Sequence, residues 1–98
     1  MKSTVTFSDF YDAFQKVRPN NFTYEGLRNL FDYLEQYEEE TGEELELDVI
    51  AFCGDYSEYD NIKEFQADYN EDYETIEDIE KETTVIPIDG ERFIIQVF

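Results

Sequence analysis

Carboxylates are the side chains of this protein that could do chemistry, because Asp and Glu make up 26 of its 98 residues. Carboxylates can hold divalent cations, act as a paired acid and base, or contact basic protein surfaces. At this density close pairs of acids are unavoidable, so a pair alone does not indicate catalysis. The chain has no His, its four glycines are isolated, and no nucleophile–base pair is recognisable. We therefore predict that this protein is not an enzyme.

The EF-hand loop is the first metal motif to test in an acidic chain. It needs oxygen ligands at positions 1, 3, 5 and 12 and a Gly at position 6. Counted from Asp68, the first three of these positions are Asp68, Asn70 and Asp72, which fit. Position 6 is Tyr73 and position 12 is Ile79, which do not fit. We expect no metal and no cofactor, and a calcium-dependent binder is kept only as a third alternative for the function.

The negative charge is concentrated in one half of the chain. The formal net charge is −19, and residues 35–82 hold 20 acids and only two bases, Lys63 and Lys81. This segment therefore carries 18 of the 19 excess charges, a concentration that solubility alone does not require. Phosphates would be repelled, so we expect no direct binding to nucleic acid or to anionic membranes. The expected partner is a basic protein surface.

Three rows of acids are predicted to lie on ordered elements. The first row shares a face of a helix at spacing i, i+3, i+7. The second alternates along a strand, which places its carboxylates about 6.6–6.8 Å apart on one face, close to the spacing of phosphates along a DNA strand. The third follows an acidic loop onto a short helix, and its two tyrosines, together with Tyr73, are expected to be partly exposed interface anchors. The candidate partner-binding residues are Asp32, Glu35, Glu39, Glu44, Glu46, Asp48, Asp55, Tyr56, Glu58, Tyr59, Asp60, Glu64 and Asp68.

The first half of the chain predicts two helices and a strand. Phe7 to Val17 has apolar residues at helical spacing, after a cap at Thr6 or Ser8 and before Pro19. A second helix is expected from Thr23, its N-cap, to Gly42, its C-cap. Residues 45–53 alternate and then become continuously apolar, which is typical of a strand that becomes buried towards its end.

The second half predicts short helices and a hairpin. Residues 55–61 read as an acidic loop, followed by short helices over 62–69, capped by Asp60, and from Thr75 onward. Strands over 83–88 and 92–98 are joined at Asp89–Gly90, a strong hairpin signal, and Pro87 places the first of them at a sheet edge. We predict a single domain, residues 1–98, with an α+β fold. In it a small antiparallel sheet of about three strands, including the C-terminal β-hairpin, packs against two longer N-terminal helices plus two short helices.

Three absences indicate where the protein works. Cys53 is the only cysteine, so no internal disulfide can form, which fits a reducing compartment. No apolar run approaches the roughly 20 residues of a membrane span. The start, Met1–Thr4, has no apolar stretch typical of a signal peptide. We expect a soluble protein of the host cytoplasm.

Several stretches resemble a family of small acidic phage and prophage proteins. The stretches that carry the resemblance are 22–27 (FTYEGL), 46–53 (ELDVIAFC), 56–59 (YSEY) and 83–96 (TTVIPIDGERFIIQ). By charge and size the chain is also similar to phage-encoded DNA mimics that block host defence, including anti-CRISPR and antirestriction proteins. Neither likeness supplies a catalytic residue.

These observations predict a phage-encoded, non-catalytic DNA mimic that blocks the nucleic-acid-binding surface of a host defence complex. An anti-CRISPR protein acting on a CRISPR effector subunit is the leading hypothesis. One alternative is an antirestriction protein, or another inhibitor of a DNA-binding enzyme, because a restriction enzyme offers the same kind of basic groove. An alternative of another class is a phage adaptor or structural protein that binds a basic partner without displacing nucleic acid. The sequence leaves the oligomeric state open.

Overall fold

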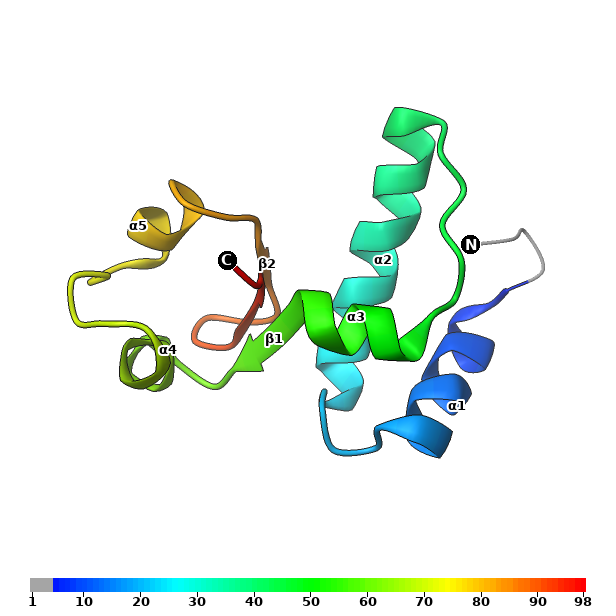
Figure 1. The fold of residues 1–98 in the computed structure, drawn as a ribbon, viewed down its shortest axis with the longest axis horizontal. Helices are drawn as coiled ribbons and strands as arrows, with labels where there is room; N and C mark the ends of the chain where they lie inside the picture. The colour runs from blue at the N-terminus through cyan, green and yellow to red at the C-terminus, as the bar shows by residue number, and fades with distance from the viewer. Residues whose placement is uncertain (1–4) are drawn as a thin grey trace.

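The computed structural model describes residues 5–98, and the expectation about Met1–Thr4 falls outside this part. Within it the chain forms five helices and three strands (Figure 1). The strands build one antiparallel sheet in the order β1-β3-β2. The predicted α+β fold with a small three-stranded sheet is confirmed. The elements are α1 (Phe7–Val17), α2 (Tyr24–Thr41), α3 (Val49–Asp55), β1 (Tyr56–Tyr59), α4 (Ile62–Asp68), α5 (Ile76–Glu80), β2 (Val85–Pro87) and β3 (Phe93–Gln96).

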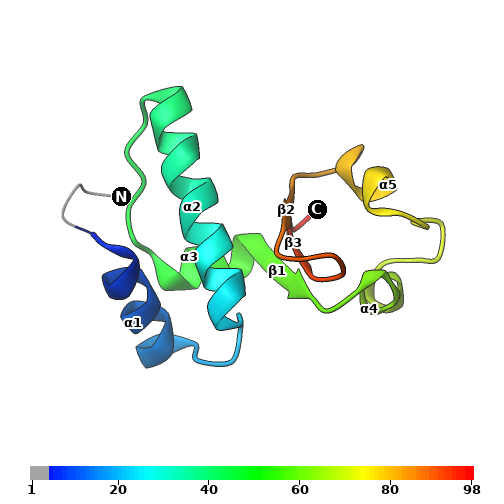
Figure 2. The same cartoon turned by 180° about the vertical axis from the view of Figure 1, so that it is seen from behind.

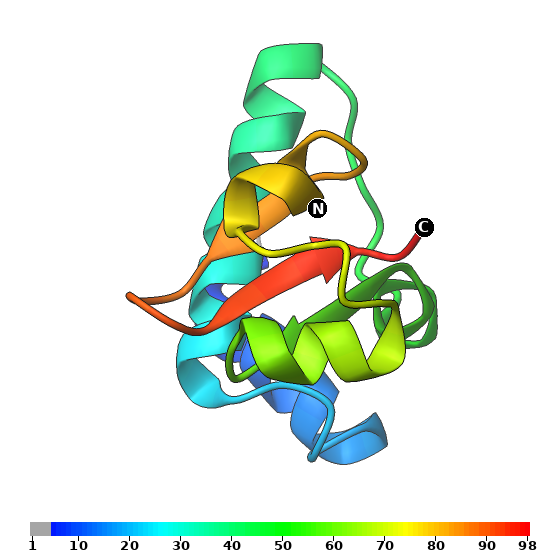
Figure 3. The same ribbon diagram turned by 90° about the vertical axis from the view of Figure 1, so that its left-hand side faces the viewer.

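The sheet is the middle layer of the molecule. Helix α2 contacts β2 and β3 on one face, while α4 and α5 lie over the other face, as Figures 2 and 3 show. Helix α1 packs against α2 and α3. The two short helices therefore cover the face that the longer helices leave open, and each face has its own hydrophobic cluster.

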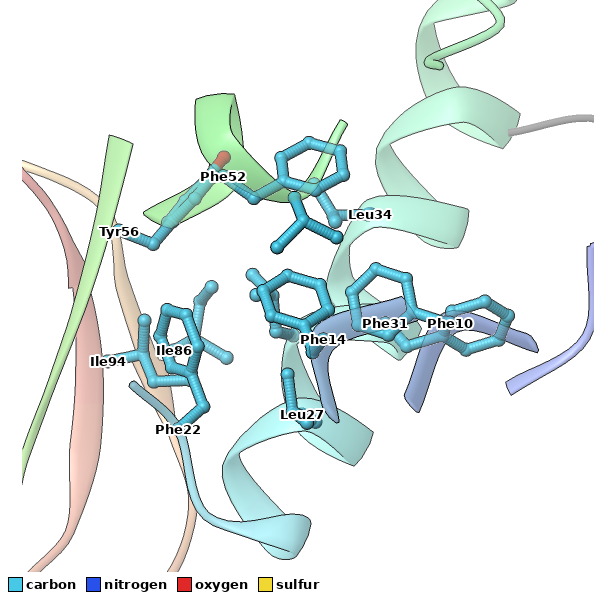
Figure 4. Close-up of a cluster of buried hydrophobic side chains, with 12 residues drawn as sticks. Phe10, Phe14, Phe22, Leu27, Phe31, Leu34, Phe52, Tyr56, Ile86 and Ile94 are labelled. Atoms are coloured by element: carbon cyan, nitrogen blue, oxygen red, sulfur yellow. The ribbon is translucent and has the colours of Figure 1, made fainter. Parts of the chain in front are cut away.

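Alternate residues of the strands contribute their side chains to different clusters. Ile86 and Ile94 point into the larger cluster, between the sheet and the first three helices (Figure 4). Phe93 and Ile95 point into the smaller cluster, under α4 and α5. Successive side chains of a strand point to opposite faces, so the Phe93–Ile95 run is buried because both faces are covered.

Local capping sets the bounds of the two long helices. The Thr6 hydroxyl accepts the Asp9 backbone N–H (3.3 Å), and the Asp9 carboxylate accepts the Thr6 N–H (3.1 Å), which is a capping box. The Thr23 hydroxyl accepts the Gly26 N–H (3.0 Å). Gly42 ends α2 with φ 74°, the left-handed conformation that a C-cap glycine adopts without a steric penalty. These predicted ends are confirmed, with Thr6 as the cap of α1.

The predicted strand over residues 45–53 is wrong. Its apolar run forms α3 instead, and Asp48 caps that helix by accepting the Ala51 N–H (3.1 Å). Val49 and Phe52 are buried three residues apart, while Ile50 is 54% exposed. An apolar run this short fits a buried strand and a helix equally well by periodicity, and contacts with α1 decide for the helix.

The strand that completes the sheet is β1, in a segment expected to be an acidic loop. Tyr56 lies opposite Gln96 and Tyr59 opposite Phe93 in the β1–β3 register. Tyr56 joins the larger cluster and Tyr59 the smaller one, so this strand is held from both faces. The predicted helices α4 and α5 are confirmed, although the N-cap of α4 is Asn61 and not Asp60.

The C-terminal hairpin forms as predicted, with Pro87 in the edge strand β2. The Asp89 carboxylate accepts the backbone N–H groups of Glu91 (2.9 Å) and Arg92 (2.8 Å) and the Arg92 Nε–H (2.8 Å). These hydrogen bonds and the Arg92 charge lower the pKa of Asp89 to about 2. The turn is therefore fixed by a carboxylate that must be ionised.

Replacing Asp89 by asparagine is expected to lower the melting temperature at neutral pH. The difference in melting temperature from wild type is expected to shrink as the pH falls to about 2. Because its folded pKa lies below the unfolded value of about 3.9, Asp89 stabilises the fold above pH 4, and this contribution is lost as the pH falls to about 2. Melting followed by circular dichroism at a series of pH values tests this. Asp60→Asn, which removes one exposed charge with no hydrogen bond among the described residues, is the control. A pH-independent difference between the Asp89 variant and wild type would contradict the prediction.

No helix within residues 5–98 is both long enough and apolar enough to cross a membrane.

Candidate functional site

The three predicted rows of acids lie on different parts of the molecule. The first row is on α2, the second on the connection from α2 to α3, and the third on α3, β1, α4 and the turns between them. Helices α2 and α4 lie on opposite sides of the sheet (Figure 1). The acids on α2 and those on α4 therefore do not share one continuous face, and each row is described separately below.

The row on α2 forms an open negative face. Asp32, Glu35 and Glu39 line a shallow hollow together with Gln36 and Glu40. The Gln36 amide donates to the Glu40 carboxylate (3.1 Å), which orders the end of this face. The last turn of α2 has no basic residue, so its acids oppose the helix dipole at a cost of a few tenths of a kcal/mol each.

One charge of this row is locally balanced. The Arg28 guanidinium lies 3.4 Å from Asp32 in an i,i+4 pair, and both side chains are more than half exposed. Exposed pairs of this kind contribute little to stability. Arg28 also lies over the Phe7 ring, at 4.8 Å from its centroid. Within residues 5–98, the acids of the row without an ion-pair partner are therefore Glu35 and Glu39.

The second row keeps its alternation without being a strand. Glu44, Glu46 and Asp48 are exposed, while Leu45 and Leu47 between them pack against the larger cluster. The alternation therefore comes from two leucines that anchor an extended segment, and no ladder of hydrogen bonds fixes its spacing. Asp48 is also engaged as the N-cap of α3, so Glu44 and Glu46 are the carboxylates that this segment presents.

Part of the third row gathers around β1. A hollow lies beside this strand, and the residues that line it are Asn20, Asn21, Tyr56, Ser57, Glu58, Tyr59, Glu64 and Asp68. Asp55 and Asp60 are exposed and do not line it. We call this hollow the β1 groove. Asn20 and Asn21, from the loop before α2, also line it, and no motif in the sequence marks them as site residues.

Glu58 connects the β1 groove to α2. One of its carboxylate oxygens accepts the backbone N–H of Thr23, the N-cap residue of α2, at 3.0 Å. Partial burial raises the pKa of Glu58, while the hydrogen bonds from Thr23 and the charge of Arg92 act in the opposite direction. A carboxylate at a helix N-terminus is favourable, so Glu58 holds α2 against the sheet.

The predicted partial exposure of Tyr56 and Tyr59 is wrong. Their relative exposures are 9% and 6%, so both belong to the core. Burial raises the pKa of Tyr56 to about 12. Burial also raises the pKa of Tyr59, and so does the Asp68 carboxylate that accepts its hydroxyl hydrogen bond at 3.0 Å. Both rings complete the packing around β1, and neither offers a broad face to a partner. Tyr73 is half-buried, so its predicted partial exposure is confirmed.

The described residues contain no group of three or more Asp, Glu or Cys side chains placed to hold a metal ion. Cys53 is half-buried against the larger cluster, and burial raises the pKa of its thiol. What the site residues can do is present fixed carboxylates to cationic groups. Comparisons of this chain with protein-family models, with curated proteins and with solved structures found no match.

Proposed function

We propose that this protein is a phage-encoded, non-catalytic inhibitor that acts in the host cytoplasm. In this proposal it binds the basic nucleic-acid-binding surface of a host defence complex, and a CRISPR effector is the proposed target. The observation that supports it best is the concentration of 18 of the 19 excess negative charges in residues 35–82. Most of these carboxylates are exposed, and no charged side chain among the described residues is buried.

The acidic face of α2 is the surface that we assign to the target. A carboxylate can take the place of a phosphate oxygen against Lys and Arg, because charge-assisted hydrogen bonds form to either group. A helix of 18 residues held against the sheet presents these carboxylates in a fixed layout. The positive potential that attracts DNA to the target would attract this face too, so we expect fast association that weakens with added salt.

Neutralising this face is expected to weaken binding to a purified CRISPR effector by about tenfold or more. The variant is Asp32→Asn, Glu35→Gln and Glu39→Gln, which keeps the size of each side chain. The control removes the same charge on the other side of the sheet, with Glu77→Gln, Glu80→Gln and Glu82→Gln. Binding is measured at several salt concentrations, with duplex DNA as a competitor.

Each outcome has a distinct meaning. Loss of binding in the α2 variant alone, together with displacement by duplex DNA, supports the proposal. Equal losses in both variants would show that total charge matters and that α2 is not the contact surface. Binding that duplex DNA does not displace would favour an adaptor for a basic partner. Binding to a restriction enzyme but not to the CRISPR effector would transfer the same mechanism to an antirestriction protein.

A further inference from the structure

The register of the sheet decides which backbone groups of β1 are used. Val97 donates its N–H to the Asp55 carbonyl (2.8 Å), and these residues are directly opposite when the β1–β3 register is extended by one pair. Hydrogen-bonded and non-hydrogen-bonded pairs alternate along an antiparallel ladder. Ser57 and Tyr59 therefore turn their N–H and C=O groups towards β3. Glu58 turns its N–H and C=O groups away from β3, towards the free edge of the sheet.

The opposite edge, at β2, is closed by a proline. The Gln96 N–H donates to the Thr84 carbonyl (3.0 Å) and the Ile88 N–H donates to the Arg92 carbonyl (3.0 Å). The backbone N–H and C=O groups of Ile86, the even-numbered residue of β2, therefore point towards β3. Pro87 is then at an outward position, where its missing N–H costs the ladder nothing and prevents another strand from pairing there. Only one edge of the sheet is protected in this way.

The edge at β1 has unused hydrogen-bonding groups beside a groove. The Glu58 N–H and C=O have no hydrogen-bond partner among residues 5–98, whereas the Tyr56 N–H caps α3 by donating to the Phe52 carbonyl. All four residues of β1 line the β1 groove, between the Asn20–Asn21 loop and α4. An extended segment in this groove would therefore lie along the strand.

The charge of the groove selects the occupant. Its charged side chains are Glu58, Glu64 and Asp68, and no Lys or Arg of the described residues 5–98 lines it. We propose that the β1 edge docks an extended, Lys- or Arg-bearing segment of a partner protein, which adds to the sheet as a fourth strand. Backbone hydrogen bonds to Glu58 fix its register, and alternate basic side chains meet the carboxylates. A second copy of this chain is disfavoured, because it would bring the same three acids to the same edge.

This docking surface goes beyond the proposed function, since it lies on β1 and requires only a basic extended segment, whatever else the partner binds. The two are separable in experiment, because the face on α2 and the β1 groove share no residue. If the α2 variant bound the effector as well as wild type does, the docking proposal for the β1 groove would not be contradicted. If the β1 groove failed to bind a basic peptide, the proposed function of the α2 face would not be contradicted.

Amide hydrogen exchange of the intact protein tests the proposal. The probe is a short capped peptide of alternating Lys and Val. In the free protein we expect fast exchange at Glu58 and slow exchange at Ser57 and Tyr59, whose N–H groups bond to β3. Saturating peptide is expected to slow exchange at Glu58 by about tenfold or more and to leave the two neighbours unchanged. The neighbours are internal controls within the same strand.

Two further comparisons separate strand addition from simple attraction. A peptide of the same charge with N-methylated backbone amides cannot pair with an edge and is expected not to bind. Glu64→Gln with Asp68→Asn keeps an acceptor for the Tyr59 hydroxyl and is expected to weaken binding of the Lys–Val peptide about threefold to tenfold. Glu77→Gln with Glu80→Gln removes equal charge on α5 and is expected to have little effect.

Three results would overturn the proposal. The first is unchanged exchange at Glu58 when the peptide is saturating. The second is equal binding of the N-methylated peptide, which would reduce the groove to a diffuse acidic surface. The third is protection of Glu58 that grows with protein concentration and needs no peptide, which would make a second copy of this chain the occupant.

Discussion

Replacing Phe65 by alanine is expected to lower the free energy of unfolding by about 3–5 kcal/mol, as is typical when a buried aromatic ring is removed. Phe65 is 0% exposed and lies at the centre of the smaller cluster. Its ring centroid lies 4.5 Å from that of Tyr69, 5.4 Å from that of Tyr59 and 6.2 Å from that of Phe93. The loss is a large part of the stability of a small domain, so the variant is expected to be marginally folded.

Phe98→Ala is the matched control for Phe65→Ala. Phe98 stacks on Tyr69, a residue packed against the same cluster, with 4.7 Å between ring centroids, but Phe98 is 46% exposed. Its removal leaves no closed cavity and is expected to cost about 1.5 kcal/mol or less. Urea unfolding followed by circular dichroism measures both variants. Similar losses in the two would show that the cluster under α4 is loosely packed, against the burial seen here.

Replacing Gly26 by alanine is expected to destabilise the protein, although the same change usually stabilises a helix by about 0.5–1 kcal/mol. An ideal Cβ at Gly26 meets the Glu58 carboxylate, which then has to leave its hydrogen bond to the Thr23 N–H. Hydrogen bonds to charged groups contribute about 1.5–3 kcal/mol, and partial exposure places this one near the lower limit. After the helix-propensity gain is subtracted, the net expected loss is about 0.5–1 kcal/mol.

The cause can be isolated with a double-mutant cycle. In a Glu58→Ala background no carboxylate occupies the space beside Gly26, so Gly26→Ala is expected to stabilise the protein by about 0.5–1 kcal/mol. The change of sign between the two backgrounds gives a coupling energy of about 1.5 kcal/mol, the contribution of the lost hydrogen bond. The free energies come from urea unfolding of all four proteins. If Gly26→Ala has the same effect in both backgrounds, Glu58 does not require a glycine on α2.

Both variants bear on the proposed surfaces. Phe65 supports α4, which carries Glu64 and Asp68, and Gly26 allows Glu58 to bridge from β1 to α2. Side chains that carry charge at the surface are therefore positioned by apolar contacts and by one close approach of backbone to carboxylate. A loss of partner binding in either variant is interpreted together with its stability.

The sequence by itself determined the features that depend on neighbouring residues. The caps at Thr6 and Thr23, the left-handed Gly42 and the turn at Asp89 all follow from hydrogen bonds or backbone freedom within a few residues. The same holds for the position of Pro87 at an edge, because a central strand needs an N–H at every residue.

Tertiary structure alone decided the identity of α3 and of β1. The run from Val49 to Phe52 could bury one face as a helix or two as a strand, and only its packing against α1 selects between them. The segment from Tyr56 to Tyr59 is predicted from its sequence to be an acidic loop. It forms a strand because it pairs with β3 and buries Tyr56 and Tyr59 in the hydrophobic clusters on the two faces of the sheet. Pairing between strands whose residues are 34 to 40 positions apart is not encoded in the local sequence pattern.

The same division explains the acids. Their number and their concentration in residues 35–82 are properties of the sequence. Which of them share a surface depends on how α2, β1 and α4 pack around the sheet, and the structure places the three predicted rows on separate parts of the molecule. Charge is additive along a chain and can be counted, whereas a binding face is a spatial arrangement that exists only after long-range apolar contacts have fixed the elements.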